Sequence, residues 1–119
     1  MLILFFIQSM IMIINNDKRR QKSMSIVVIG ADYLGAIEKK LYLLGVTNLK
    51  HIDGRRVSNQ NKISIPPRTD FVLVLTDYVN HNTAKMVKEI ARSRNVPLIF
   101  SKRSWGAVEE KLISSGVMN

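Results

Sequence analysis

The chain has 119 residues, 46% of them hydrophobic and 23% charged, a composition typical of one globular domain and unlike that of a disordered protein. It contains no cysteine, which excludes disulfides, thiolate zinc sites and a cysteine nucleophile, and fits a reducing compartment such as the cytoplasm. Its net charge of +9 favours anionic partners, which include phosphorylated ligands and nucleic acid.

The first 23 residues differ in character from the rest of the chain. Residues 1–14 are apolar except for Gln8 and Ser9, a run shorter than the roughly 20 residues that a membrane-spanning helix needs. Positive charge follows this run, whereas a secretory signal has its charge in front. We therefore expect residues 1–23 to be a mis-assigned extension or a disordered leader, with Met24 as the true start and no membrane contact. The alternative is an amphipathic anchor at a membrane surface.

Residues 24–119 are expected to form one α/β domain, because short apolar runs alternate with segments of helical periodicity. In chain order the pattern predicts a strand at 25–29, a helix at 32–44, a strand at 48–52, a polar loop at 57–68, a strand at 70–75, a polar loop at 76–82, a helix at 83–94, a strand at 97–100 and a helix from 104 to about 115.

This order of elements predicts a small open parallel sheet of about four strands with helices on both faces, a Rossmann-like α/β fold. Right-handed crossovers give the strand order 2-1-3-4. The last strand would then have an exposed edge. We therefore expect the protein to pair with a second subunit and form a homo-oligomer.

The segment from Ile26 to Gly35 predicts a buried strand, a tight turn and a helix start. Gly30 and Gly35 take the first and third positions of the dinucleotide fingerprint G-x-G-x-x-G, and Asp53 lies near the expected place of a ribose-binding acid. Asp32, however, puts a side chain and a negative charge at the middle position. We expect Asp32 to cap the following helix, with dinucleotide binding as the weaker alternative.

Polar residues follow each predicted strand. In open parallel sheets, ligands bind beyond the carboxyl ends of the strands, near the point where the strand order reverses. Cations from two of these segments are expected to hold an anion, since guanidinium groups suit phosphate and carboxylate. The full set of candidate ligand-binding residues is Gly30, Asp32, Gly35, Asp53, Arg55, Arg56, Thr76, Asn80, Asn82, Ser101, Lys102, Arg103 and Ser104.

The segment from Thr76 to Thr83 is the richest in reactive side chains. Asp77 and His81 are candidates for an acid–imidazole pair, and His81 is the candidate ligand for a metal or haem. His51 is a weaker second histidine candidate. The other interpretation is a loop whose Asn and Asp side chains satisfy backbone groups.

Four blocks resemble one bacterial family: SIVVIGADYLG from Ser25, HIDGR from His51, VLVLTDYVNHN from Val72 and IFSKRSW from Ile99. The chain from Met24 to Leu112 resembles domain of unknown function 2325, a family of uncharacterised Rossmann-like proteins. The resemblance implies a cytoplasmic, self-associating α/β domain and no established reaction or cofactor.

The leading functional interpretation is a non-catalytic module that binds a small anionic or phosphorylated ligand. In it, Arg55, Arg56, Lys102 and Arg103 hold the anion above the Gly30–Gly35 turn. One alternative is a haem- or metal-binding protein or small enzyme that uses His81 with Asp77. Another is a nucleic-acid-binding protein, whose affinity would fall steeply with salt.

Overall fold

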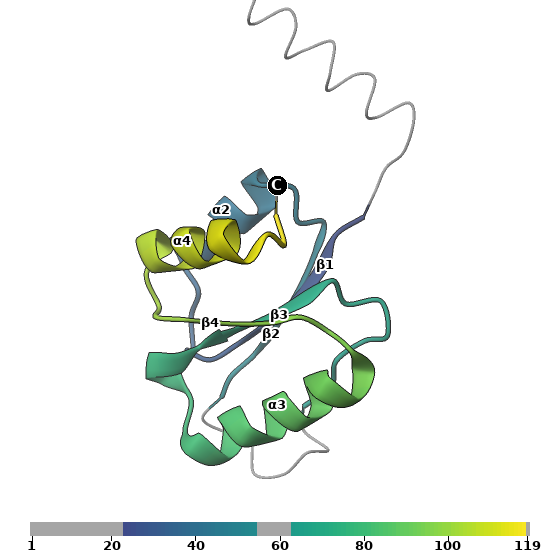
Figure 1. The fold of residues 1–119 in the computed structure, drawn as a ribbon. Coiled ribbons are helices and arrows are strands. Elements are labelled where there is room, and N and C mark those ends of the chain that lie inside the picture. Colours follow the sequence, from purple (N-terminus) through teal and green to yellow (C-terminus); the bar gives the residue numbers. More distant parts are fainter. Residues whose placement is uncertain (1–22, 55–62, 119) are drawn as a thin grey trace, which may run out of the picture.

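The computed structural model describes residues 23–54 and 63–118, and it forms an open parallel sheet of four strands in the order β2-β1-β3-β4 (Figure 1). The predicted fold class and strand order are confirmed. The prediction for residues 1–23 falls almost wholly outside these ranges. The elements are β1 (Ser25–Ile29), α2 (Ala36–Leu43), β2 (Asn48–Ile52), β3 (Phe71–Leu75), the 3-10 turn η2 (Thr76–Tyr78), α3 (His81–Arg94), β4 (Leu98–Ser101) and α4 (Trp105–Ser115).

The two central strands are buried on both faces. All five residues of β3 are buried, as are the last four of β1, which explains why neither strand alternates with polar residues. β1 pairs with β2 through Ile26↔Leu49 and with β3 through Ile26↔Phe71. The carboxyl ends of β1 and β3 therefore lie side by side, where the strand order reverses.

Helices cover the sheet unequally. α2 and α4 lie on one face and α3 lies on the other (Figure 1). Ile26, Val28 and Phe71 belong to the core beneath α2 and α4, while the intervening Val27 and Val72 pack on the α3 side. The two-residue period of the strands thus divides one apolar run between two cores.

Two helices begin where the sequence did not predict. α2 begins at Ala36 rather than residue 32, because Gly30, Ala31 and Gly35 have φ of 118°, 67° and 58°, outside the helical region. Gly35 is its N-cap, without a side-chain cap hydrogen bond, so the prediction that Asp32 caps this helix was wrong. α3 begins at residue 81 rather than 83, because Asn80 is its cap.

Part of the predicted polar loop contributes to the core. Ile63 and Ile65 are buried in the cluster beneath α3, and the Arg94 guanidinium donates a hydrogen bond to the Ile65 carbonyl. This segment therefore closes the α3 side of the sheet ahead of β3. Within the described ranges, no helix is long and apolar enough to cross a membrane.

Candidate functional site

The turn after β1 is tied to the end of β2. The Gly30 N–H donates to the Ile52 carbonyl at 2.9 Å, and His51 Nε2 donates to the Gly30 carbonyl at 2.8 Å. His51 is half-buried beside this turn. The weaker of the two histidine candidates therefore holds the backbone of the glycine turn.

Val79 packs against the glycine turn after β1 and against Gly54 after β2. A Cβ added at Gly30 would lie 3.0 Å from the Leu75 carbonyl oxygen and 3.2 Å from Val79 Cγ1. A Cβ added at Gly54 would lie 2.5 Å from the same Val79 methyl. The two glycines thus make room for a side chain of this protein. The packing of Val79 therefore accounts for Gly30 and Gly54 without a ligand, whereas Gly35, the other fingerprint glycine, has a φ of 58°.

Arg103 joins the glycine turn to η2. Its backbone N–H donates to Asp77 Oδ1 at 2.9 Å, and its guanidinium Nε donates to the Tyr33 carbonyl at 3.1 Å. The guanidinium carbon also lies 5.8 Å from the centroid of the Tyr78 ring, within cation–π range. Arg103 was predicted to hold an anion. In the structure it instead links the glycine turn to η2 through these contacts.

Asn80 fixes the start of α3. Its Oδ1 accepts a hydrogen bond from the Thr83 N–H at 2.7 Å, and its carbonyl accepts from the Ala84 N–H at 3.0 Å. The backbone N–H groups of His81 and Asn82 have no partner among the residues the structure describes. These two donors, together with the positive end of the helix dipole, leave the start of α3 able to receive an anion.

Replacing Asn80 by alanine is expected to lower the free energy of unfolding by about 1 kcal/mol, because the Thr83 N–H loses its acceptor. Urea denaturation followed by circular dichroism measures the change. Asn82→Ala is the matched control, since Asn82 is exposed in the first turn and alanine is the better helix former there. Equal losses in both variants would contradict the capping role.

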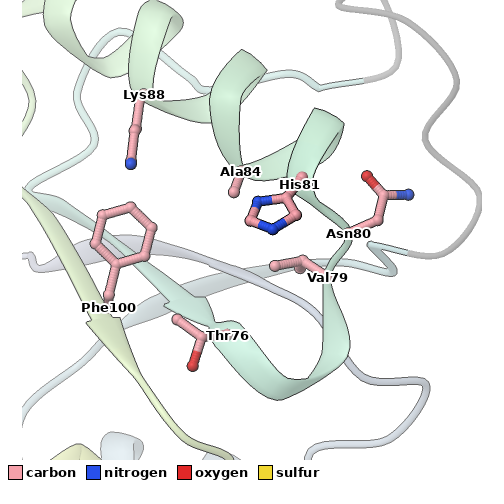
Figure 2. A pocket seen from close by; sticks show the side chains of 7 residues that line it. All are labelled: Thr76, Val79, Asn80, His81, Ala84, Lys88 and Phe100. Carbon is pink, nitrogen blue, oxygen red and sulfur yellow. The ribbon is translucent and has the colours of Figure 1, made fainter.

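An open pocket of about 300 Å³ lies between α3 and β4, and we call it the α3–β4 pocket (Figure 2). Phe100 lies on its β4 side, with Lys88 Nζ 5.3 Å from the centroid of its ring. His81 lies opposite, at the start of α3. The lining residues are Thr76, Val79, Asn80, His81, Ala84, Lys88 and Phe100.

The structure brings only some of the candidate residues together. Thr76, Asn80 and His81 meet at the α3–β4 pocket, whereas Asp77 lies against Arg103. Within the described part of the chain, no hydrogen bond joins Asp77 to His81. Groups of three or more His, Asp or Glu side chains that could hold a metal ion are likewise absent there.

The remaining candidates are distributed around the same edge of the sheet. Ser101 is buried and its hydroxyl donates to the Lys102 carbonyl at 2.9 Å, while the Ser104 side chain caps α4 by accepting from the Ala107 N–H at 3.3 Å. The Lys102 side chain is exposed. Asp32, Gly35 and Asp53 lie on the turns after β1 and β2. Arg55 and Arg56 lie outside the described residues.

Four residues that line the α3–β4 pocket were missed in the sequence: Val79, Ala84, Lys88 and Phe100. Lys88 lies seven residues after His81, which is two helical turns along the same face, so a helix start at residue 81 would have linked them. Phe100 ends an apolar run and was assigned only to the predicted strand at 97–100. Nothing in the sequence pointed to Val79 as a site residue, because its role depends on Gly30 and Gly54, which pack against it.

In a comparison with known protein families, the family described as uncharacterized protein conserved in bacteria, DUF2325, matches residues 25–114. The chain belongs to this family. The resemblance seen in the sequence is thereby confirmed. No curated protein and no solved structure matches the chain.

The DUF2325 match extends from the first residue of β1 into the last turn of α4. It therefore includes the whole sheet and every residue that lines the α3–β4 pocket. The family description assigns no ligand or reaction.

Proposed function

We propose that this DUF2325 protein is a non-catalytic module of the bacterial cytoplasm that binds a small anionic ligand, such as a phosphorylated metabolite, in the α3–β4 pocket. The observation that carries the proposal is the convergence of Lys88, His81 and the start of α3 on one pocket. An ammonium group, an imidazole and free backbone N–H groups are all hydrogen-bond donors that suit phosphate oxygens.

The start of α3 supports an anion more than a cation. The N–H groups of His81 and Asn82 have no partner among the described residues, and the helix dipole adds partial positive charge at the same place. Lys88 lies farther along the helix, on the same pocket. A phosphate in this pocket would therefore meet positive charge from the helix end and from Lys88.

The charges of the described helices are distributed unevenly. α3 carries Lys85, Lys88, Arg92 and Arg94 against a single acid, Glu89, whereas α4 carries Glu109 and Glu110 against Lys111. Anions are attracted to the more positive face of a protein, which raises their local concentration there. The charge distribution therefore directs an anionic ligand to the side of the sheet that holds the pocket.

The sequence-based alternatives have less support. A haem or metal site at His81 lacks the acidic neighbour expected for it, because Asp77 Oδ1 accepts the Arg103 backbone N–H. A nucleic acid shares the phosphate chemistry of the proposed ligand, and it differs in its dependence on salt. The salt dependence of oligonucleotide binding and the absorbance of haem distinguish these two alternatives from the proposed function.

Replacing Lys88 by glutamine is expected to weaken the binding of inorganic phosphate or ADP about tenfold, because one charge-assisted hydrogen bond is lost. The measurement is the shift of the unfolding temperature of the full chain with increasing ligand, against sodium chloride of equal ionic strength. Lys88 is exposed and glutamine keeps the first two methylenes of its stem, so the fold should be preserved.

Lys111→Gln is the matched control, because Lys111 is an exposed lysine on α4, on the opposite face of the sheet. It should bind phosphate and ADP as the unmodified protein does. No shift with any anion beyond the salt control, or equal weakening by both variants, would refute the proposal. Tighter binding of an oligonucleotide with a steep salt dependence would favour the nucleic-acid alternative. A haem absorbance change lost in His81→Ala would favour a haem site.

A further inference from the structure

One edge of the sheet presents unpaired backbone groups. β4 pairs with β3 on one side, from Val72↔Leu98 to Leu75↔Ser101. The Val72 N–H donates to the Pro97 carbonyl at 2.9 Å. The backbone hydrogen-bonding groups of every second residue, counted from Pro97, therefore point toward β3. The N–H and C=O groups of Leu98 and Phe100 therefore face away from the sheet. They have no partner among the residues that the structure describes.

The β4 edge has few of the features that normally protect such an edge. Residues 96–101 read Val-Pro-Leu-Ile-Phe-Ser and carry no charge, and Leu98 and Phe100 are only half-buried. The opposite edge, β2, carries Lys50 and His51 within its five residues. Charged side chains on an edge strand discourage pairing with another chain, so β4 is the edge suited to it.

We propose that β4 pairs antiparallel with β4 of a second copy about a two-fold axis at Ile99, which joins two four-stranded sheets into one. Leu98 of each copy then lies opposite Phe100 of the other, and each such pair exchanges two hydrogen bonds. The partner that suits this edge is a second copy of the same chain. The same strand supplies matching donors and acceptors when it is rotated by half a turn.

The hydrogen bonds around β4 favour Ile99 as the centre over its neighbours. A two-fold axis at Leu98 would require the Val96 N–H to donate to the second copy, but this N–H already donates to the Ala91 carbonyl at 3.0 Å. A two-fold axis at Phe100 would require the Lys102 carbonyl to accept a hydrogen bond from the second copy, but this carbonyl already accepts from the Ser104 N–H at 2.9 Å. A centre at Ile99 uses only groups that lack a partner within the described residues.

This pairing covers apolar surface as well as backbone. A two-fold axis perpendicular to the sheet leaves both α3 helices on the same face, so the half-buried Leu98 and Phe100 of one copy meet those of the other. Phe100 also lines the α3–β4 pocket, which therefore borders the proposed interface. The inference depends on the strand edge alone and does not require that the pocket bind an anion.

The first test compares two leucines on the two edge strands. Leu98→Lys places a charge at the proposed interface, and Leu49→Lys places the same charge at a half-buried position of β2. Light scattering after gel filtration of the full chain should give about twice the 13.6 kDa chain mass for the unmodified protein and for Leu49→Lys. Leu98→Lys should give the chain mass. Circular dichroism verifies that both variants fold.

The second test fixes the register with a disulfide, since the natural chain has no cysteine. Facing Ile99 positions would have Cα atoms about 4.5 Å apart, which a disulfide can bridge. Ile99→Cys should form a covalent dimer under mild oxidation, whereas Lys50→Cys, at the centre of β2, should not. The proposal is refuted by a monomeric unmodified protein at 100 μM, by equal effects of the paired variants, or by a folded Ile99→Cys that stays uncrosslinked.

Discussion

Replacing Phe71 by alanine is expected to lower the free energy of unfolding by about 3–5 kcal/mol. Phe71 is 1% exposed at the start of β3 and belongs to the core beneath α2 and α4. It lies next to Ile26 of β1 across the ladder, so the loss would leave a cavity in the core between the two central strands and the helices α2 and α4. Since domains of this size are stable by about 5–15 kcal/mol, the variant should retain little stability.

Urea denaturation monitored by circular dichroism measures this change. The matched control is Leu43→Ala on α2, because the Leu43 side chain is 85% exposed and its removal leaves no cavity. The control should change the free energy of unfolding by less than about 0.5 kcal/mol. A loss below about 1 kcal/mol in Phe71→Ala would show that the sheet does not depend on this core.

The centre of the sheet could be predicted from the sequence because Ile26 to Ile29 of β1 and Phe71 to Leu75 of β3 are unbroken apolar runs. Phe71 to Leu75 are buried on both faces, and the segment contains no polar residue that would have made its assignment ambiguous. The turn before α2 could not be predicted, because Ala31 adopts a positive φ that its side chain does not favour. The burial of Ile63 and Ile65 was also missed, since the alternation Ile63-Ser64-Ile65 is too short to predict a strand and two prolines follow it.

The sequence predicted which edge of the sheet would hold a pocket better than it predicted the contacts around that pocket. The rule for strand carboxyl ends selected Thr76, Asn80 and His81, and all three line the α3–β4 pocket. The rule could not show that the Arg103 guanidinium donates a hydrogen bond to the Tyr33 carbonyl, because these two residues are distant in the sequence. It also gave Gly30 the role of approaching a ligand, where the structure shows Val79 against the turn.

Gly54 is the position where a single added methyl group should disturb the site most. Its Cβ would lie 2.5 Å from Val79 Cγ1 and 3.1 Å from the Tyr78 carbonyl oxygen, in a buried position. Gly54→Ala should therefore lower the free energy of unfolding by about 1–3 kcal/mol, the usual cost of overpacking. Gly106→Ala on α4 is the control. No atom lies within 4 Å of its added Cβ, so it should not be destabilising.

A double-mutant cycle distinguishes this clash from a general intolerance of alanine at Gly54. Val79→Ala removes the methyl groups that the new Cβ would meet, so combined with Gly54→Ala it should cost less than the sum of the two single variants. Additive losses would show that Val79 does not pack against Gly54. Because Val79 also lines the α3–β4 pocket, Gly54→Ala should change the phosphate response, whereas Gly106→Ala should leave it unaltered. Packing at the strand ends would then control the shape of the binding site through one valine.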